Sequence, residues 1–292
     1  MTAIASPMPS QQYRSAVGHD LTMGGIVKSE WVKLRSLRST WWCGGLIFAL
    51  TFGFGLLVAL GLMERRRQEL AEGLVSGMTA PDFTVLTANN GLTMLGQMVA
   101  VVFGALAVTG EYSSGSIRST LAAAPRRGQV LVAKVIATLV FTALVGTVSI
   151  VATSAAIAAL LEAAGQSNGI GPDAFALGAG GVYYLVVSAL IGIGLGFILR
   201  SGAGAIAAGI ALLFVVPMVL AFGSGNEVIA YILELTPWQA SQLMTAVAPS
   251  EVAQIGSGEW VLGGYWGGAA CLAAWAAAAL IPARIIFRRR DA

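Results

Sequence analysis

The chain has 292 residues, of which 57% are hydrophobic and only 11% are charged, and its formal net charge is +3. Soluble domains usually carry about 25% charged residues, so this composition argues against a soluble domain and favours a polytopic membrane protein. The charges gather between long apolar blocks, as expected when each block must lie in hydrocarbon.

The N-terminal region predicts a tail followed by a surface helix. Residues 1–22 are polar or small and lack the apolar core of a secretory signal peptide, which predicts a flexible cytoplasmic tail. The next stretch, IVKSEWVKLRSLRSTWW, predicts an amphipathic helix lying in the membrane interface. Its apolar face would consist of Val27, Trp31, Leu34, Leu37 and Trp41. Lys28 and Arg35 lie away from this face, whereas Arg38 intrudes on it.

Six apolar stretches follow along the chain. They cover residues 43–63, 92–109, 135–161, 176–199, 202–222 and 261–283. Each reaches about the 18–20 residues that a helix needs to cross the hydrocarbon core, and the third must tilt or extend past the interface. None of them contains Asp, Glu, Lys or Arg. The sequence therefore predicts an all-α fold with six transmembrane helices, with residues 23–292 forming a single membrane domain.

Lys and Arg residues give the orientation, because basic residues concentrate on the cytoplasmic side. With six spans, fourteen of the 17 Lys and Arg residues fall on one side of the membrane. The other three, the triplet Arg65–Arg67, directly follow the first span and lie beside several acidic residues. This distribution predicts that both termini are cytoplasmic, and the triplet has no explanation in the sequence.

The connection after the second span, GEYSSGSIRSTLAAAPRRGQVLVAK, predicts a short helix at the cytoplasmic surface. Ser113 or Ser114 would cap its start, and Glu111 would lie near that positive end. One apolar face would contain Ile117, Leu121 and Ala124. Pro125 would end the helix, followed by Arg126 and Arg127. The alternative interpretation is a plain basic connector that obeys the positive-inside rule.

Between the fifth and sixth spans, residues 223–260 contain YILELTPWQASQLMTAV, which is too short and too polar to cross the membrane. It predicts a re-entrant or surface helical hairpin with Pro237 at the bend. Gly192 and Gly196 have the G-x-x-x-G spacing of closely packed membrane helices. We expect this pair to pack within one subunit rather than between subunits.

Several function classes lack the residues that they need. Ion-driven pumps use ionisable groups inside the membrane, and the spans contain none. The chain has no phosphate loop, so any energy from ATP would have to enter through another protein. His19, Cys43 and Cys271 form no pattern of a metal site, disulfide framework or nucleophilic triad. We therefore expect no catalytic residues, no metal, no cofactor and no nucleic-acid partner.

The connection after the second span closely resembles the corresponding segment of type-2 ABC exporter permeases. These proteins are membrane subunits that pair with a separate ATPase. Their pattern is E-x-x-x-G-[ST]-I-R, followed by a basic patch and a long third helix. The matching residues are Glu111, Gly115, Ser116, Ile117, Arg118, Arg126, Arg127 and Lys134. The resemblance extends over nearly the whole chain, although the long first outer loop with its Arg triplet departs from the family pattern.

The resemblance implies a complex in the cell inner (plasma) membrane. It would contain two ATPase subunits and a second permease subunit, either identical or different. The loop helix would be a coupling helix that docks on the ATPase, with Arg118 pairing with an acidic residue there. Leu121 would add to the apolar docking face, and Glu111 would hold the loop to neighbouring helices. The interfacial helix, with Trp31, Leu34 and Arg35, would touch the ATPase beside it.

The family builds its translocation pathway at the interface between the two membrane subunits, mainly from the second and fifth spans. Here that implies a lining of Met94, Gln97, Met98, Phe103, Phe214, Met218 and Phe222. Such adaptable apolar side chains suit an amphipathic or lipophilic cargo, such as a drug, antibiotic, peptide or lipid. Contact with lipid or packing inside the subunit is the alternative for each of them. A scaffold or sensor subunit that docks a signalling partner without transport is the alternative for the whole chain.

Overall fold

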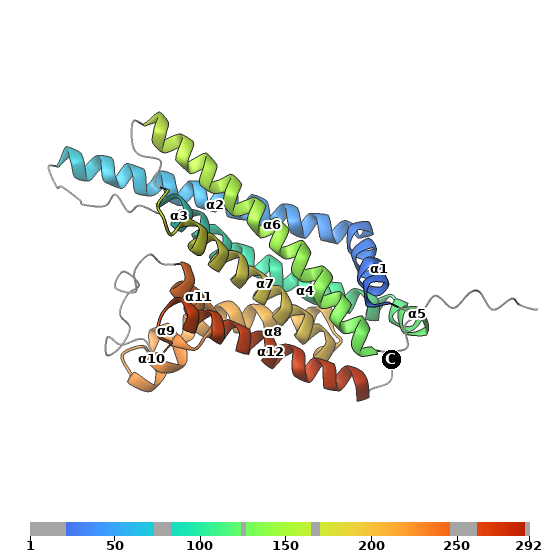
Figure 1. The fold of residues 1–292 in the computed structure, drawn as a ribbon. Helices are drawn as coiled ribbons and strands as arrows, with labels where there is room; N and C mark the ends of the chain where they lie inside the picture. Colours follow the sequence, from blue (N-terminus) through green and yellow to red (C-terminus); the bar gives the residue numbers. More distant parts are fainter. Residues whose placement is uncertain (1–21, 73–82, 124–126, 165–169, 246–261, 290–292) are drawn as a thin grey trace, which may run out of the picture.

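The computed structural model describes residues 22–72, 83–123, 127–164, 170–245 and 262–289. Within these ranges all regular secondary structure is helical (Figure 1). Six helical segments are long and apolar enough to cross a membrane. They are Arg38–Arg65, Phe83–Ser113, Arg127–Ala163, Ala174–Leu199, Gly202–Phe222 and Tyr265–Arg289. The predicted all-α fold with six spans is therefore confirmed.

The first half of the chain contains the interfacial helix and three spans. Its elements are α1 (Met23–Ser36), α2 (Arg38–Ala71), α3 (Phe83–Gly91), the π-helical segment η1 (Leu92–Gly96), α4 (Gln97–Ser113), α5 (Ser116–Ala123) and α6 (Arg127–Ala163). Together, α3, η1 and α4 form the second span. The predicted N-terminal tail, apart from Thr22, lies outside the described residues.

The second half contains the remaining three spans and two short helices. Its elements are α7 (Ala174–Leu199), α8 (Gly202–Ile210), the π-helical segment η2 (Ala211–Val215), α9 (Val216–Phe222), α10 (Glu227–Glu234), α11 (Pro237–Thr245) and α12 (Tyr265–Arg289). The fifth span is made of α8, η2 and α9. Only Arg200 and Ser201 join α7 to α8.

The fourth span, α7, lies at the centre of the bundle and packs against α4, α6 and α12. Its glycines allow this close packing. A methyl group at Gly192 would overlap the backbone carbonyl of Val101 in α4, and one at Gly104 would overlap the carbonyl of Ala189 in α7. Gly196 packs on Val108. The expected packing of Gly192 and Gly196 within one subunit is therefore confirmed.

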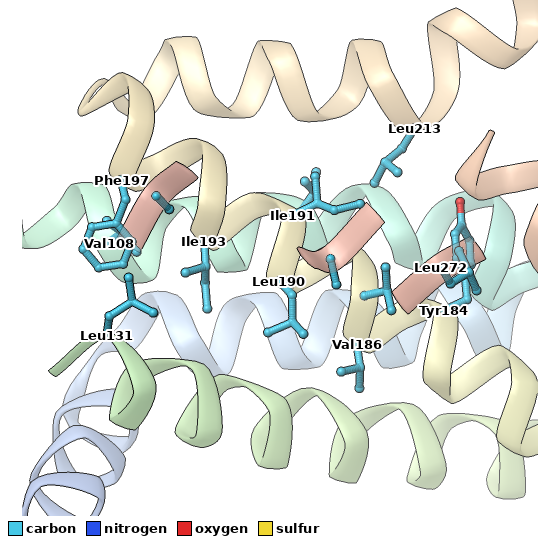
Figure 2. Packing of buried hydrophobic residues seen from close by; sticks show 14 of the residues in the cluster. Val108, Leu131, Tyr184, Val186, Leu190, Ile191, Ile193, Phe197, Leu213 and Leu272 are labelled. Carbon is cyan, nitrogen blue, oxygen red and sulfur yellow. The ribbon is translucent and has the colours of Figure 1, made fainter. Parts of the chain in front are cut away.

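The main hydrophobic cluster follows α7 along its length. Figure 2 shows part of it, from Tyr184 at one end to Phe197, Val108 and Leu131 at the other. Phe197 also contacts Phe287 of α12, with ring centroids 4.7 Å apart. The core thus joins the second, third and sixth spans, and Leu213 of the fifth, around the fourth span.

The fifth span has the predicted bounds, whereas the other five are longer than predicted, most clearly the second, which begins at Phe83 rather than near residue 92. Polar residues such as Thr87 and Asn89 interrupt the apolar pattern there, but they are buried. The Asn89 side-chain amide donates to the Leu177 carbonyl of α7 at 3.0 Å. The Thr87 hydroxyl donates to the Phe83 carbonyl of its own helix at 2.7 Å. Hydropathy missed this first part because such polar groups can bond within the bundle instead of to water.

The first and third spans run past the rest of the bundle at one end (Figure 1). Here α2 packs on α6 through Ala59, Ile157 and Leu161. The basic triplet lies on this extension of α2, and Arg67 pairs with Glu64 at 3.7 Å in an exposed position. The triplet is therefore part of a continuous helix, not of a loop.

Two short helices, α10 and α11, lie where the sequence predicted a hairpin, and Pro237 is the first residue of α11. Helix α11 is largely buried between α7 and α12. There, methyl groups at Gly180 and Gly268 would each crowd a carbonyl oxygen of α11 at 2.5 Å. By contrast, α10 leaves Val228 and Ile232 exposed. One helix of the pair thus enters the bundle, and residues 246–261 lie outside the described part.

Candidate functional site

Four helices meet in a buried cluster of charges at one end of the bundle. Lys134 of α6 contacts Glu30 of α1 at 2.7 Å and Glu111 of α4 at 3.0 Å. Lys33 of α1 contacts the same two carboxylates at 2.7 and 3.3 Å. Its ammonium also donates to the hydroxyl of Thr120 in α5 at 3.0 Å. These five residues, the charge cluster, tie α1, α4, α5 and α6 together.

Burial makes the charge cluster most sensitive to the loss of a partner of Glu30 or Lys134. Glu30 is 2% exposed and Lys134 is 3% exposed. A buried charge without a partner is costly, whereas two carboxylates alternating with two ammonium groups compensate one another. The cluster therefore holds its four helices in one arrangement.

The pKa values of the two α1 residues reflect this compensation. Burial alone would raise the pKa of Glu30, but the ammonium groups of Lys134 and Lys33 outweigh it and hold the pKa below its ordinary value. Burial would likewise lower the pKa of Lys33, but Glu30 and Glu111 raise it above its ordinary value. Both residues are therefore charged at neutral pH.

The sequence of α1 places its charges in register. Thr22 caps the helix by accepting a hydrogen bond from the Gly25 backbone at 3.2 Å. Ile26, Glu30 and Leu34 follow at helical spacing and form the buried stripe. Glu30 therefore occupies the centre of an otherwise apolar face. Sequence analysis missed it, although its position between Ile26 and Leu34 was the available signal.

The predicted apolar face of the interfacial helix is only partly right. Leu34 is buried and Trp31 is half-buried, while Arg35 is exposed as expected. Leu37 and Trp41 are exposed, because Leu37 adopts an extended conformation and α2 starts at Arg38. The predicted single helix is therefore two helices with a break at Leu37.

The turn before α5 differs from the predicted cap. Ser113 and Ser114 belong to the end of α4, where their hydroxyls donate to the Gly110 carbonyl at 3.1 and 2.8 Å. Gly115 then reverses the chain with a φ of 72°, a conformation that glycine adopts without strain. Ser116 begins α5, and its hydroxyl lies 2.9 Å from that of Ser114. Glu111 lies in the last turn of α4 rather than at the start of α5.

The apolar face of α5 points inward, which corrects its predicted use as a docking face. Ile117 is 4% exposed and belongs to the main hydrophobic cluster, and Leu121 packs against that cluster. Arg118 and Ala122 lie on the exposed side. Apolar side chains four residues apart on a short helix are buried by their own bundle here.

Two basic residues, Arg126 and Arg127, follow α5 in the sequence. Arg126 lies outside the described residues. Arg127 begins α6, and its guanidinium donates to the Phe287 carbonyl of α12 at 3.4 Å. Arg127 thus connects the third and sixth spans.

Arg200 was not predicted as a site residue, yet its guanidinium lies 5.2 Å from the ring centre of Tyr112 in α4. It ends α7 in a left-handed conformation with φ 54°.

The residues implied for the translocation pathway separate into two sets. Met94, Phe214, Met218 and Phe222 are exposed, and Met98 is half-buried. Gln97 and Phe103 are buried inside this chain. Gln97 accepts a hydrogen bond from the Tyr184 hydroxyl of α7, and Phe103 packs on Phe141 of α6. Packing within the subunit therefore accounts for Gln97 and Phe103, and the other members of the set leave part or most of their surface exposed.

Both spans implied for the pathway contain a π-helical turn. Gln97 donates its backbone N–H to Leu92, five residues earlier, and Val216 does the same to Ala211. Pro217 explains the second turn, since it removes a helical donor and crowds the preceding carbonyl groups. Such turns are frequent at functional sites in membrane and soluble helices. The first has no comparable proline.

The described part of the chain contains no cluster of potential metal ligands and no disulfide bond. No three His, Cys, Asp or Glu residues come together there as metal ligands. Cys43 and Cys271 are free thiols. The arrangement of charges serves to join helices.

Comparison with protein families gives one match. The family described as ABC-2 family transporter protein matches residues 25–292 of this chain. No curated protein matches it at a significant level. The match includes the charge cluster, α5 and all six spans.

Proposed function

The chain belongs to the ABC-2 transporter family, and on this premise we propose that it is the membrane subunit of an ATP-driven exporter. Membership of this family implies association with the membrane and with an ABC ATPase. The proposed complex contains two ATPase subunits and a second permease subunit, identical or different. Residues 23–292 act as one permease domain in the cell inner (plasma) membrane, with both termini cytoplasmic.

The charge cluster is the observation that carries this proposal. It joins α5, which resembles a coupling helix, to α1 through Lys33, and Lys33 in turn contacts Glu111 of the second span, which contacts Lys134 of the third span. Arg118 on the exposed side of α5 supplies a guanidinium that suits an acidic residue of a partner. A displacement of α5 therefore reaches two spans through short, charge-assisted contacts.

In the proposed mechanism, ATP binding brings the two ATPases together and moves the α5 and α1 pair. A rigid unit transmits such a displacement, whereas a flexible loop would absorb it. The permease pair then shifts between inward-facing and outward-facing states. The π-helical turns of the second and fifth spans are the weaker points where those helices can bend. Met94, Phe214, Met218 and Phe222 offer apolar contacts to an amphipathic or lipophilic cargo.

The experiment separates coupling from folding. Thr120→Val preserves the shape of the side chain but removes the hydroxyl that accepts from Lys33. Loss of a hydrogen bond to a charged group is worth about 1.5–3 kcal/mol. We therefore expect cargo-stimulated ATPase activity of the reconstituted complex to fall roughly tenfold or more. Ser113→Ala, which removes only a local hydrogen bond to Gly110, is the control.

Arg118→Glu tests the docking side of α5 in the same assay. The variant should insert normally but lose the ATPase partner during co-purification. Arg289→Glu makes the same charge change at an exposed position on α12 and should retain the partner. Full partner binding, stimulation and transport by both Thr120→Val and Arg118→Glu would show that α5 is only a basic connector.

Two further measurements address energy source and orientation. The purified chain alone should show no saturable ATP binding, because it has no phosphate loop. Single cysteines placed at residues 10 and 290 should resist an impermeant thiol reagent in intact cells. Labelling of either position would overturn the proposed orientation.

A further inference from the structure

A pocket of about 610 Å³ lies at the same end of the bundle as the charge cluster but is lined by other residues. It is formed where the start of α6 meets the end of α12, beside the first residue of α1. Three of its lining residues are arginines: Arg127, Arg284 and Arg288. No acidic residue is among its described lining residues, so the pocket is strongly basic.

The helices hold the arginines at fixed positions. Arg284 and Arg288 are one turn apart on α12. The guanidinium of Arg288 lies over Gly128 of α6, where a methyl group would come 3.0 Å from its Nη2 atom. Arg127 is anchored by its hydrogen bond to the Phe287 carbonyl. The absence of a side chain at Gly128 thus leaves room for Arg288 against the backbone of α6.

The start of α6 adds to the positive charge. The first backbone N–H groups of a helix lack helical acceptors and carry the positive end of its dipole. Gly128 and Gln129, the second and third residues of α6, line the pocket. Arginine side chains and backbone N–H groups together are the donors that bind phosphate in proteins.

Apolar surface continues from the pocket along both helices. On α6, Val132, Ile136 and Val140 follow Gly128 at four-residue spacing and are 36–39% exposed. On α12, Ile281 and Ile285 are exposed in the stripe beside Arg284 and Arg288. Both helices are candidate membrane spans, and the stripes lie next to the basic pocket, which is formed by the start of α6 and the end of α12.

We propose that this pocket binds the headgroup of an anionic phospholipid. The arginines and the α6 start would hold the phosphate, and the acyl chains would lie on the α6 and α12 stripes. Basic pockets between membrane helices at the cytoplasmic side suit such headgroups. In the orientation proposed above, the lipid belongs to the cytoplasmic leaflet. A free anion or an acidic protein surface would use the arginines but would leave the apolar stripes unused.

Lipid binding to the purified full chain tests the proposal. The probes are dioleoyl phosphatidylglycerol, which is anionic, and dioleoyl phosphatidylcholine, which is neutral. Bound lipid is counted by native mass spectrometry, and the thermal unfolding midpoint is measured at each lipid concentration. The test variant is Arg284→Gln/Arg288→Gln, and Arg289→Gln, which removes the same charge outside the pocket, is the control.

The parent chain and Arg289→Gln should prefer phosphatidylglycerol and should be stabilised by it. Each basic residue near a membrane surface contributes about fivefold in affinity, so the double variant should lose roughly 30-fold for phosphatidylglycerol. Its phosphatidylcholine binding should not change. Arg284→Lys/Arg288→Lys retains both charges and should keep most of the preference, which separates loss of charge from loss of fold.

Four results would overturn the proposal. One is equal binding of the two lipids by the parent chain. Another is an equal loss in Arg289→Gln, which would reduce the effect to general surface charge. The third is equal stabilisation by inorganic phosphate alone, which would make the pocket a free-anion site. If phosphatidylglycerol has no effect and the double variant instead releases the ATPase partner, the pocket is a protein-docking surface and the lipid proposal fails.

Discussion

The fourth and fifth spans are both strongly apolar, yet the fold uses them in opposite ways. In the most apolar stretch of α7, 67% of the residues are buried, against 22% in the fifth span, α8–η2–α9. Hydropathy records only that a helix can enter the membrane. The neighbours of each helix are decided by where small residues allow close approach.

Glycine positions show the difference. Along α7, a methyl group at Gly192 or Gly194 would overlap the backbone of a neighbouring helix. In α8, a methyl group at Gly204 would meet only the side chains of Ser201 and Leu199, at 3.4–3.9 Å. The rest of the fifth span exposes Val215, Val219 and other large apolar groups. The fourth span is thus a structural centre, and the fifth offers a surface to lipid or to another subunit.

The strongest way to break this contrast is to enlarge a glycine of the fourth span. Gly192→Val places the branched valine side chain against the Val101 backbone carbonyl of α4. That carbonyl cannot shift without displacing the helix to which it belongs. Overpacking of this kind costs about 1–3 kcal/mol and sometimes more. We expect loss of most monodisperse protein on gel filtration. Gly204→Val, the matched change in the fifth span, should elute like the parent, and equal losses in both variants would remove the distinction.

A smaller effect should follow from Tyr184→Phe, which removes one buried hydroxyl of the fourth span. Gln97 would keep a buried side-chain oxygen without its donor. Leaving such a group unpaired costs about 1–3 kcal/mol. The thermal unfolding midpoint in detergent should fall by a few degrees, about 2–4 °C per kcal/mol for a chain of this size. Tyr231→Phe, at an exposed site of α10, should leave the midpoint unchanged.

Acid should perturb the packed side of the molecule without acting on the fifth span, which has no titratable side chain. The pKa of Glu30 is lowered from 4.5 in the fold, so its contribution to stability is present above about pH 4.5. That contribution is lost as pH falls through the lower folded pKa. Lys33 behaves in the opposite sense, and its contribution is lost only as pH rises through a pKa above 10.5.

Unfolding midpoints measured against pH test this assignment. The parent chain should have a plateau at intermediate pH and lose stability on the acid side. Glu30→Gln should be less stable on the plateau and should show a shallower decline in acid. If stability declines equally steeply in acid in both proteins, the loss of stability at low pH comes from carboxylates other than Glu30.

The smallest effect on folding should come from the fifth span itself. Met218→Ala and Phe222→Ala remove large side chains that are 53% and 84% exposed. Surface changes of this kind usually alter stability by no more than about 0.5 kcal/mol. The unfolding midpoint should stay close to the parent value while cross-linking between permease subunits or cargo transport declines. A large loss of stability would mean that these residues pack within one subunit.

The sequence was sufficient for features that depend on local pattern. Apolar length predicted the six spans, and Pro237, predicted at the bend of a hairpin, directly follows the turn between α10 and α11. It was not sufficient where a partner is distant in the chain. Glu30 finds Lys134 across 104 positions, and nothing in the α1 pattern identifies that partner. The predicted outward direction of the α5 apolar face was wrong for the same reason, since Ile117 packs against helices far away in sequence.

The link between the fourth and fifth spans has a mechanical consequence. Arg200 and Ser201 alone separate the two helices; Arg200 lies over Tyr112, and Ser201 caps α8 through the Gly204 backbone at 3.3 Å. One end of the fifth span is thereby held against the fourth span, while most of its side surface is exposed. The 21 residues of the span measure about 31 Å at 1.5 Å per residue. A swing of about 10° at the pin carries the far end, at Phe222, through about 5 Å. The span is a lever whose small angular movement becomes a displacement as wide as a side chain.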